Sequence, residues 1–370
     1  MQLIWWPGLL AFAGAMLAMW VLVRLAPRLG LLDHPEGRKD HAMPTPVVGG
    51  LAMLLACVVV LPLTLPLTHH FGALGFAALI VVAVGAYDDR NGLGWLCRLG
   101  WQCAAGLVIA LWGGARVEEL GAAFGLAGLD LGIWSIPFTV FATVGLINAM
   151  NMIDGADGLA GSLALAALGM LGAAALYAGN DLLAERVLIL CGALAGFLVW
   201  NLRFPWRARA SAFMGDAGSG LLGLLIAWIA FRLTQNPGHP VNPVLALWLL
   251  PIPVMDCLVL IVRRLQERRS PFEAGRDHIH HVMADAGYSP MQIVAGLVLF
   301  SLCTGLTAGQ AMRMNVPNPL LLGLYLLLCL SWYLLTRRRE RAVLLFRRLH
   351  VGRTRVVHAG VADAGGKDPV

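Results

Sequence analysis

Long apolar stretches recur along nearly the whole chain and leave few folds open to it. We delimit eleven, at residues 3–23, 47–68, 71–87, 95–113, 132–150, 159–178, 187–200, 217–234, 242–262, 291–312 and 317–336. Most have the roughly 17–25 residues that a helix needs to cross a bilayer. Only 13% of the 370 residues are charged, and the mean hydropathy is +0.74. Because helices satisfy their own backbone hydrogen bonds in lipid, the sequence predicts an all-α polytopic integral membrane protein with about 11 transmembrane helices.

Basic residues are distributed unevenly over the loops between these stretches. All but four of the 27 lysines and arginines lie in the odd-numbered loops and the C-terminal tail; the four are Arg116, Arg186, Arg232 and Arg313. The positive-inside rule then assigns the odd loops to the cytoplasm. We therefore expect the N-terminus outside and the C-terminus inside. That orientation requires an odd number of spans, which eleven satisfies and ten does not.

The chain divides into a transmembrane domain, residues 1–336, and a basic cytoplasmic tail, residues 337–370. The first stretch has no basic region before it and is too long for the core of a signal peptide, so we expect it to remain as a helix. In the tail, residues 337–355 are rich in arginine. We interpret them as a topology anchor, and a basic helix on anionic lipid is the alternative.

Five aspartates lie at the ends of apolar stretches, where a carboxylate is costly and is therefore a functional candidate. They are Asp88, Asp89, Asp154, Asp157 and Asp216, and all of them fall on odd loops. Adjacent carboxylates such as Asp88 and Asp89 repel one another unless a cation or a shared proton relieves them. The pattern favours metal-assisted phosphate chemistry on the cytoplasmic face, although Asp88 and Asp89 alone could also form a solvated helix end.

Two glycine-rich motifs strengthen this interpretation. Residues 148–161 hold Asn148, Asn151, Asp154, Asp157 and three glycines, more polar and flexible residues than a plain turn between spans requires. Residues 213–220, Phe-Met-Gly-Asp-Ala-Gly-Ser-Gly, begin an apolar stretch. Backbone amides at such a helix start bind phosphate or a metal-bound carboxylate, and a simple helix cap by Asp216 is compatible with that role.

A third motif, residues 276–281, reads Arg-Asp-His-Ile-His-His. A zinc site is one interpretation of its histidines, but no cysteine or fourth ligand has suitable spacing. We favour cationic or hydrogen-bonding imidazoles around a pyrophosphate, with His278, His280 and His281 in that role. The first loop adds Arg38 and Lys39 as candidate phosphate contacts, with topology signalling as the competing interpretation.

Taken together, these motifs resemble those of the polyprenyl-phosphate N-acetylhexosamine-1-phosphate transferases. The resemblance runs in order from the first loop to the ninth. The His-Ile-His-His loop, with Arg98 and Gln102, is similar to the bacterial branch that acts on undecaprenyl phosphate and UDP-GlcNAc. The branch that transfers phospho-MurNAc-pentapeptide differs, since its loop carries three consecutive histidines.

The resemblance implies transfer of GlcNAc-1-phosphate from UDP-GlcNAc to undecaprenyl phosphate, with release of UMP. It also implies Mg²⁺, replaceable by Mn²⁺, the bacterial inner membrane with the active site on the cytoplasmic face, and a lipid-linked surface polysaccharide such as O-antigen as the destination. Membrane lipids are expected partners, nucleic acid is not, and a homodimer is a candidate assembly.

The resemblance also carries roles to single residues. Catalytic roles fall to Asp88, Asp89, Asp154, Asp157, His278, His280 and His281; substrate binding to Lys39, His41, Arg98, Asn148, Asn151, Asn201, Phe213 and Arg276; and metal binding to Asp216 and Asp89. Within these groups, Phe213 would stack on uracil and Asp88 would deprotonate or align the lipid phosphate. Asn201 would belong to the uridine pocket, although its distance along the chain from Phe213 is longer than in the pentapeptide branch.

Two other functions compete with this one. The same chemistry on another UDP-N-acetylhexosamine is the closer rival. A secondary transporter would also explain many spans and buried charge, but transporter sites lie near the bilayer midplane on broken helices of repeated halves. The sequence has its carboxylates at one face and no visible repeat.

Overall fold

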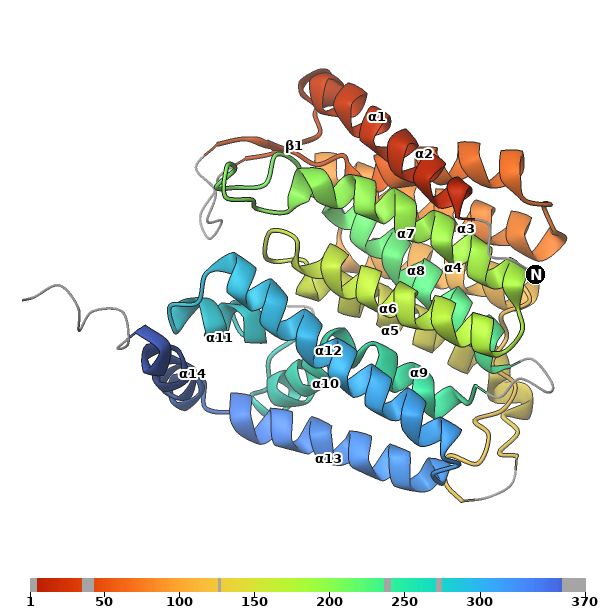
Figure 1. The fold of residues 1–370 in the computed structure, drawn as a ribbon, viewed down its shortest axis with the longest axis vertical. Helices are drawn as coiled ribbons and strands as arrows, with labels where there is room; N and C mark the ends of the chain where they lie inside the picture. The colour runs from red at the N-terminus through yellow and green to blue at the C-terminus, as the bar shows by residue number, and fades with distance from the viewer. Residues whose placement is uncertain (1–4, 35–42, 126–127, 236–240, 271–274, 355–370) are drawn as a thin grey trace, which may run out of the picture.

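The computed structural model describes residues 5–34, 43–125, 128–235, 241–270 and 275–354. Within these ranges the chain is a bundle of helices with one short antiparallel hairpin (Figure 1). The helices are α1 (Trp6–Leu29), α2 (Gly49–Thr64), α3 (His69–Asn91), α4 (Trp95–Leu111), η1 (Gly132–Trp134), α5 (Ser135–Ile153), α6 (Leu159–Tyr177), α7 (Asp181–Asn201), α8 (Gly215–Thr234), α9 (Pro243–Leu249), α10 (Pro251–Gln266), α11 (Ile279–Asp285), α12 (Pro290–Arg313), α13 (Asn318–Thr336) and α14 (Arg339–Thr354), and the hairpin strands are β1 (Leu32–Asp33) and β2 (Thr45–Pro46).

Every apolar stretch predicted from the sequence falls on helix. In the described part of the chain, eight helices are long and apolar enough to cross a membrane: α1, α3, α5 with η1, α6, α7, α8, α12 and α13. The shorter apolar helices α2 and α4 have 16 and 17 residues. The remaining stretch, residues 242–262, is shared by α9 and α10. The predicted class, an all-α polytopic membrane protein, is therefore confirmed.

The sequence analysis treated residues 242–262 as one continuous helix, and this prediction is wrong. The stretch breaks at Leu250, and α9 and α10 meet at an angle of 90°. Pro251 and Pro253 follow the break directly. Because proline lacks a backbone N–H and its ring clashes with the preceding turn, a straight helix cannot run through this point. Hydropathy alone does not register such a break.

Helix α7 begins earlier than predicted, at Asp181 instead of residue 187. Asn180 caps it by accepting a hydrogen bond from the Leu183 backbone N–H. Glu185 and Arg186 interrupt the apolar pattern but are buried. The Arg186 guanidinium lies 4.5 Å from the centre of the Phe71 ring and donates to the Pro66 carbonyl. A buried charge satisfied in this way belongs to the helix and not to a loop.

Helix α8 occupies the centre of the bundle, where it packs against α2, α3, α5 and α6. Glycines permit the close approach: a Cβ at Gly50 would lie 2.3 Å from the Gly218 nitrogen, and one at Gly85 would lie 2.5 Å from the Ala217 Cα. Small residues at helix contacts are the usual means of tight packing in membranes. The N-terminus of α8, which carries Asp216, is thereby wedged against the end of α3.

The hairpin, α11 and α14 gather at one end of the bundle (Figure 1). Helix α14 packs against α11 and α13. The basic tail therefore begins as a helix, as one of its two interpretations required. The end of the tail, residues 355–370, lies outside the described residues.

Candidate active site

All five aspartates singled out in the sequence line one cavity at the end of the bundle that holds α11. Its volume is about 880 Å³, within the range of roughly 300–1,000 Å³ typical of ligand sites. It is lined by Asp33, Thr45, Val47, Asp88, Asp89, Asn151, Asp154, Gly155, Ala156, Asp157, Asn201, Arg203, Arg209, Ala210, Phe213, Gly215, Asp216, Arg276, His280, His281, Ala284, Tyr288, Pro290 and Ile293. Segments far apart in the chain thus converge on one site, as predicted.

Asp89 caps the N-terminus of α8. Its two carboxylate oxygens accept from the backbone N–H groups of Asp216 and Ala217, at 2.9 and 3.3 Å. A cap of this kind satisfies amides that a helix start would otherwise leave without partners. Gly215 adopts a φ of +73°, and a Cβ there would lie 2.4 Å from Asp89. The cap that the sequence analysis considered for Asp216 is thus supplied by Asp89, and Asp216 is left to face the cavity.

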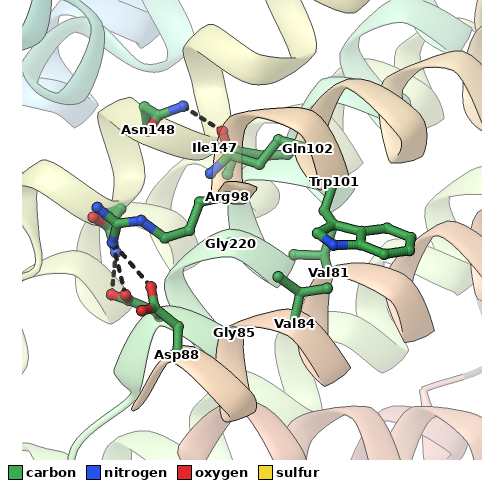
Figure 2. Close-up of a pocket in the computed structure, with 12 residues that line it drawn as sticks. Val81, Val84, Gly85, Asp88, Arg98, Trp101, Gln102, Ile147, Asn148 and Gly220 are labelled. Atoms are coloured by element: carbon green, nitrogen blue, oxygen red, sulfur yellow. Dashed lines mark hydrogen bonds and ion pairs between the residues drawn. The ribbon is translucent and has the colours of Figure 1, made fainter. Parts of the chain in front are cut away.

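Arg98 bridges Asp88 and Asp216. Its Nη1 lies 3.0 Å from Asp88 Oδ2 and 3.1 Å from Asp216 Oδ2. Figure 2 shows the Arg98 guanidinium joined to the Asp88 carboxylate by a dashed line. Asn151 donates to the other oxygen of Asp216 and to the Ser219 hydroxyl. One cation therefore offsets two carboxylates, and the site keeps an excess of negative charge.

A second, small cavity of about 40 Å³ opens beside this bridge. Val81, Val84, Trp101 and Ile147 supply its apolar walls (Figure 2). The rest of the lining is polar and comes from Asp88, Arg98, Gln102, Asn148, Asn151 and Asp216. Three residues, Asp88, Asn151 and Asp216, line both cavities. The two cavities therefore meet at the Asp88–Arg98–Asp216 bridge.

The turn between α5 and α6 contributes Asp154 and Asp157. Asp157 is held by Arg203, whose Nε lies 2.7 Å from its Oδ2, and by the Ala210 backbone N–H at 3.0 Å. For Asp154, burial and then the charges of Asp216 and Asp157 raise the pKa to about 7. A carboxylate in that state is stabilised by any cation that enters the cavity.

The asparagines predicted to bind substrate are already engaged within the protein. Asn201 accepts from the Gly158 N–H at 2.9 Å and donates to the Ala212 carbonyl at 3.0 Å. Asn148 donates to the Gln102 side chain at 2.7 Å. Asn201 therefore joins the α5–α6 turn to the loop before α8 at the wall of the cavity.

The three histidines separate into two groups. His280 and His281 line the cavity, whereas His278 does not. His278 points at Asp256 of α10, with its Nδ1 2.7 Å from Oδ2. Both ring nitrogens of His280 are buried, and neither has a hydrogen-bond partner among the described residues. Burial, followed by His281, His278 and Arg276, holds the pKa of His280 well below 6.5, so the ring is neutral near pH 7.

Gly155 explains how His280 reaches the aspartates. A Cβ at Gly155 would lie 2.4 Å from His280 Nε2. Only glycine therefore admits the ring at this distance from the α5–α6 turn. Two motifs separated by more than a hundred residues in the chain are thus in direct contact.

Sequence reasoning missed several residues of the site. Arg203 and Arg209 line the cavity, although their positions suggested only topology signals. Tyr288 also lines it, and Asp256 supports the histidines. The predicted Arg276 does line the cavity, whereas Lys39 and His41 lie outside the described residues.

The donor atoms of the cavity fit a hard divalent cation. Within the described ranges, no three histidine, cysteine or acidic side chains stand together as a complete set of ligands for one ion. Mg²⁺ does not require such a set, since it usually binds one or two carboxylates together with substrate phosphates. Burial and, after it, the charges of Asp216 and Asp157 raise the pKa of Asp154, and a bound ion would offset both effects.

Known proteins with similar sequences agree with this geometry. The family model for glycosyl transferase family 4 matches residues 71–234. The chain is 34% identical to an undecaprenyl-phosphate alpha-N-acetylglucosaminyl 1-phosphate transferase of Yersinia pestis over 91% of its length and 92% of the relative. Proteins of the same name from Escherichia coli O157:H7 and Haemophilus influenzae are each 34% identical, over 82% and 76% of this chain and 83% and 79% of their own lengths.

The match to the family model spans α3 to α8, the segment that supplies all five aspartates. The match to the Yersinia pestis protein covers 91% of the chain and therefore also includes the histidine loop. By this similarity and by its site, the chain belongs to the family of undecaprenyl-phosphate alpha-N-acetylglucosaminyl 1-phosphate transferases, within glycosyl transferase family 4.

Proposed function

We propose that this enzyme transfers GlcNAc-1-phosphate from UDP-GlcNAc to undecaprenyl phosphate. An oxygen of the lipid phosphate attacks the sugar-bearing phosphorus of the donor. The bond from that phosphorus to the bridging oxygen breaks, UMP leaves with the electron pair, and undecaprenyl-pyrophosphoryl-GlcNAc forms. One observation carries the proposal: a small cavity with apolar walls on one side and polar residues on the other meets a large polar cavity at the Asp88–Arg98–Asp216 bridge. A lipid phosphate and a sugar nucleotide require such a pair of sites.

The acceptor phosphate is assigned to the junction of the two cavities, where Arg98 suits it. The neighbouring apolar residues Val81, Val84 and Trp101 suit the first carbons of a polyprenyl chain, which the small cavity itself does not enclose. Asp88 aligns or deprotonates that phosphate. Phosphoryl transfer asks mainly for positioning and charge neutralisation. A direct attack, without a covalent enzyme intermediate, is therefore the simpler mechanism for this arrangement.

The donor is assigned to the large cavity. Phe213 stacks on the uracil, and the nucleotide region lies along Asp154, Asp157 and Asn201. Arg203, Arg209 and Arg276 line this cavity and supply positive charge for phosphate oxygens. His280 and His281 hydrogen-bond the pyrophosphate, and the neutral ring of His280 acts there as a hydrogen-bonding group and not as a cation.

Asp216 is the proposed ligand of Mg²⁺ or Mn²⁺. Asp89, first assigned to the metal as well, keeps Asp216 in position through the cap on α8. A bound ion would offset the charge of the pyrophosphate and of the departing UMP. EDTA should abolish transfer, and Mg²⁺ or Mn²⁺ should restore it. Asp216→Asn should raise the Mg²⁺ concentration needed for half-maximal rate, and full activity in excess chelator would contradict the assignment.

The membrane arrangement follows from the helices and the charges. Eight helices, or nine with the bent α9–α10 pair, are long and apolar enough to cross a membrane in the described part of the chain. Crossings by the shorter α2 and α4 would bring the number to the eleven predicted from the sequence. With basic loops inside, the site faces the cytoplasm of a bacterial inner membrane, where UDP-sugars are made. The product would begin a surface polysaccharide such as O-antigen, and a homodimer remains a candidate assembly.

The test is a transfer assay on purified protein in detergent. With undecaprenyl phosphate present, UDP-GlcNAc should yield UMP and a radiolabelled lipid. Other UDP-N-acetylhexosamines, tested as a panel, should react far more slowly, and a faster reaction with one of them would reassign the sugar. The bent α9–α10 pair resembles the broken helices of secondary transporters, the rival class. A transporter would release no UMP from any donor.

A further inference from the structure

Asp256 is a buried acid that the reaction as described does not use. It lies in α10, and only 5% of its surface is exposed. A buried carboxylate is costly unless it is hydrogen-bonded, and Asp256 has three donors. The Nδ1 of His278 lies 2.7 Å from its Oδ2, and the Ile279 backbone N–H and the Trp332 Nε1–H each lie 3.3 Å from its Oδ1.

The bond to His278 determines how that ring is oriented. A carboxylate only accepts hydrogen bonds, so the ring must donate through Nδ1–H. This holds the proton of a neutral ring on Nδ1 and leaves Nε2 without one. His278 is itself buried, with 7% of its surface exposed, and lies directly before α11. Together with the Ile279 amide, the same carboxylate therefore anchors both the side chain and the backbone at the start of α11.

The orientation of His278 passes to the histidines of the cavity by ring contact. The His278 and His280 rings are stacked, with centroids 5.6 Å apart and planes 9° apart. The His280 and His281 rings lie 4.1 Å apart. The His280 ring has no hydrogen-bond partner in the described part of the chain. Its position is therefore set by the contacts with the His278 and His281 rings and by the space that Gly155 leaves for it.

We propose that Asp256 is a positioning residue for the phosphosugar transfer, and that it acts through His278 to hold His280 and His281 against the donor. The inference rests on the proposed function. The sequence analysis assigned His278 to the pyrophosphate. The proposal instead gives His278 the role of orienting His280 and His281. A carboxylate behind a functional histidine is a common way to fix the ring and its tautomer.

A double-mutant cycle tests the proposal, with Asp256→Asn, His278→Gln and the double variant. Asp256→Asn keeps the size of the side chain but can present an amide N–H to the ring. We expect kcat for UMP release to fall about 10- to 100-fold, the range for outer partners of functional histidines, with KM for UDP-GlcNAc changed less than about threefold. The double variant should be no slower than the slower single variant, because both substitutions interrupt the same chain of contacts.

Trp332→Phe is the matched control. It removes one hydrogen bond from Asp256 and leaves the His278 contact intact. We expect Trp332→Phe to lower the melting temperature in detergent about as much as Asp256→Asn does. Its kcat should nevertheless stay within about threefold of the wild type. In protein labelled with ¹⁵N-histidine, the Nδ1–H signal that His278→Gln abolishes should shift in Asp256→Asn and persist in Trp332→Phe.

Three results would overturn the inference while the wild type remains active. They are a normal kcat in Asp256→Asn, losses that multiply in the double variant, and an equal loss of kcat in Trp332→Phe. A purely structural role predicts the last two. If the wild type releases no UMP from any UDP-sugar, the proposed function fails first, and the inference, which concerns that reaction, falls with it.

Discussion

Asp88 is one of three residues that line both cavities, and this position defines its test. It ends the apolar part of α3, and Arg98 joins it to Asp216. If Asp88 prepares the acceptor phosphate, Asp88→Asn should lower turnover by two or more orders of magnitude while UDP-GlcNAc still binds. Equilibrium binding of labelled UDP-GlcNAc and steady-state release of UMP measure the two separately.

The competing mechanism makes a different prediction for the same residue. A covalent aspartyl intermediate would let the enzyme release one equivalent of UMP without any lipid acceptor. Rapid mixing of lipid-free wild type with UDP-GlcNAc should give no such burst. A stoichiometric burst that disappears in Asp88→Asn would replace direct attack with a two-step mechanism.

Asp154 predicts how stability depends on pH in the absence of metal. Its pKa is about 7 in the folded protein, against an ordinary value of 3.8. Between these values the folded state binds more protons than the unfolded state, so raising the pH through this window lowers the free energy of unfolding. The melting temperature of metal-free protein should therefore fall from about pH 5 to about pH 8, and Asp154→Asn should flatten the profile.

A divalent cation should reverse this trend, since a nearby positive charge favours the ionised carboxylate. Mg²⁺ should accordingly raise the melting temperature more at about pH 8 than at about pH 5. An equal effect of Mg²⁺ at both values would show that the ion does not compete with the proton on Asp154.

At the scale of elements, the site depends on how closely α3 and α8 approach. Gly85 and Gly75 both lie in α3, but a Cβ at Gly85 would lie 2.5 Å from the Ala217 backbone, whereas one at Gly75 meets nothing within 4 Å. Gly85→Ala should cost about 1–3 kcal/mol from overpacking and should displace Asp216. Gly75→Ala should be neutral or slightly stabilising, because alanine favours helix.

Melting temperature in detergent and the rate of UMP release, measured on both variants, check this prediction. The pair separates a general effect of alanine in α3 from the specific contact with α8. Equal behaviour of the two variants would mean that the approach of α3 to α8 does not control the site.

Which parts of this arrangement were predictable follows from the range of the interactions. The apolar stretches predicted the helices because the bilayer imposes their length. The charge of the loops predicted that the five aspartates lie on one face of the membrane. The partners of these residues were not predictable. Asp89 caps α8 through the backbone of Asp216, 127 residues later, and Asp256 meets a histidine 22 residues away in another element. Residue type and local spacing carry no information on such pairs.

The ends of helices were missed for a local reason. Pro251 breaks the ninth predicted stretch, and Glu185 with Arg186 shortened the seventh although both side chains are buried in α7. Hydropathy averages over a window, so it neither registers one proline nor recognises a charged pair that the fold satisfies.

For the whole molecule, α8 relates the site to the membrane. Asp216 lies in its first turn, and Arg232, in its last, donates to the Gly114 carbonyl. A helix of 20 residues is about 30 Å long, the thickness of the hydrocarbon core. The aspartates and the loop that holds Gly114 therefore lie at opposite ends of a membrane-spanning element.

This geometry and the positive-inside rule together predict which end faces the cytoplasm. Green fluorescent protein fused after Thr336 should fluoresce in cells, and alkaline phosphatase fused there should be inactive. Fusions in the loop after α12, at Val316, should show the reverse pattern. Fluorescence at Val316 with phosphatase activity at Thr336 would turn the site away from the cytoplasm and from its nucleotide donor, so topology alone can contradict the proposed reaction.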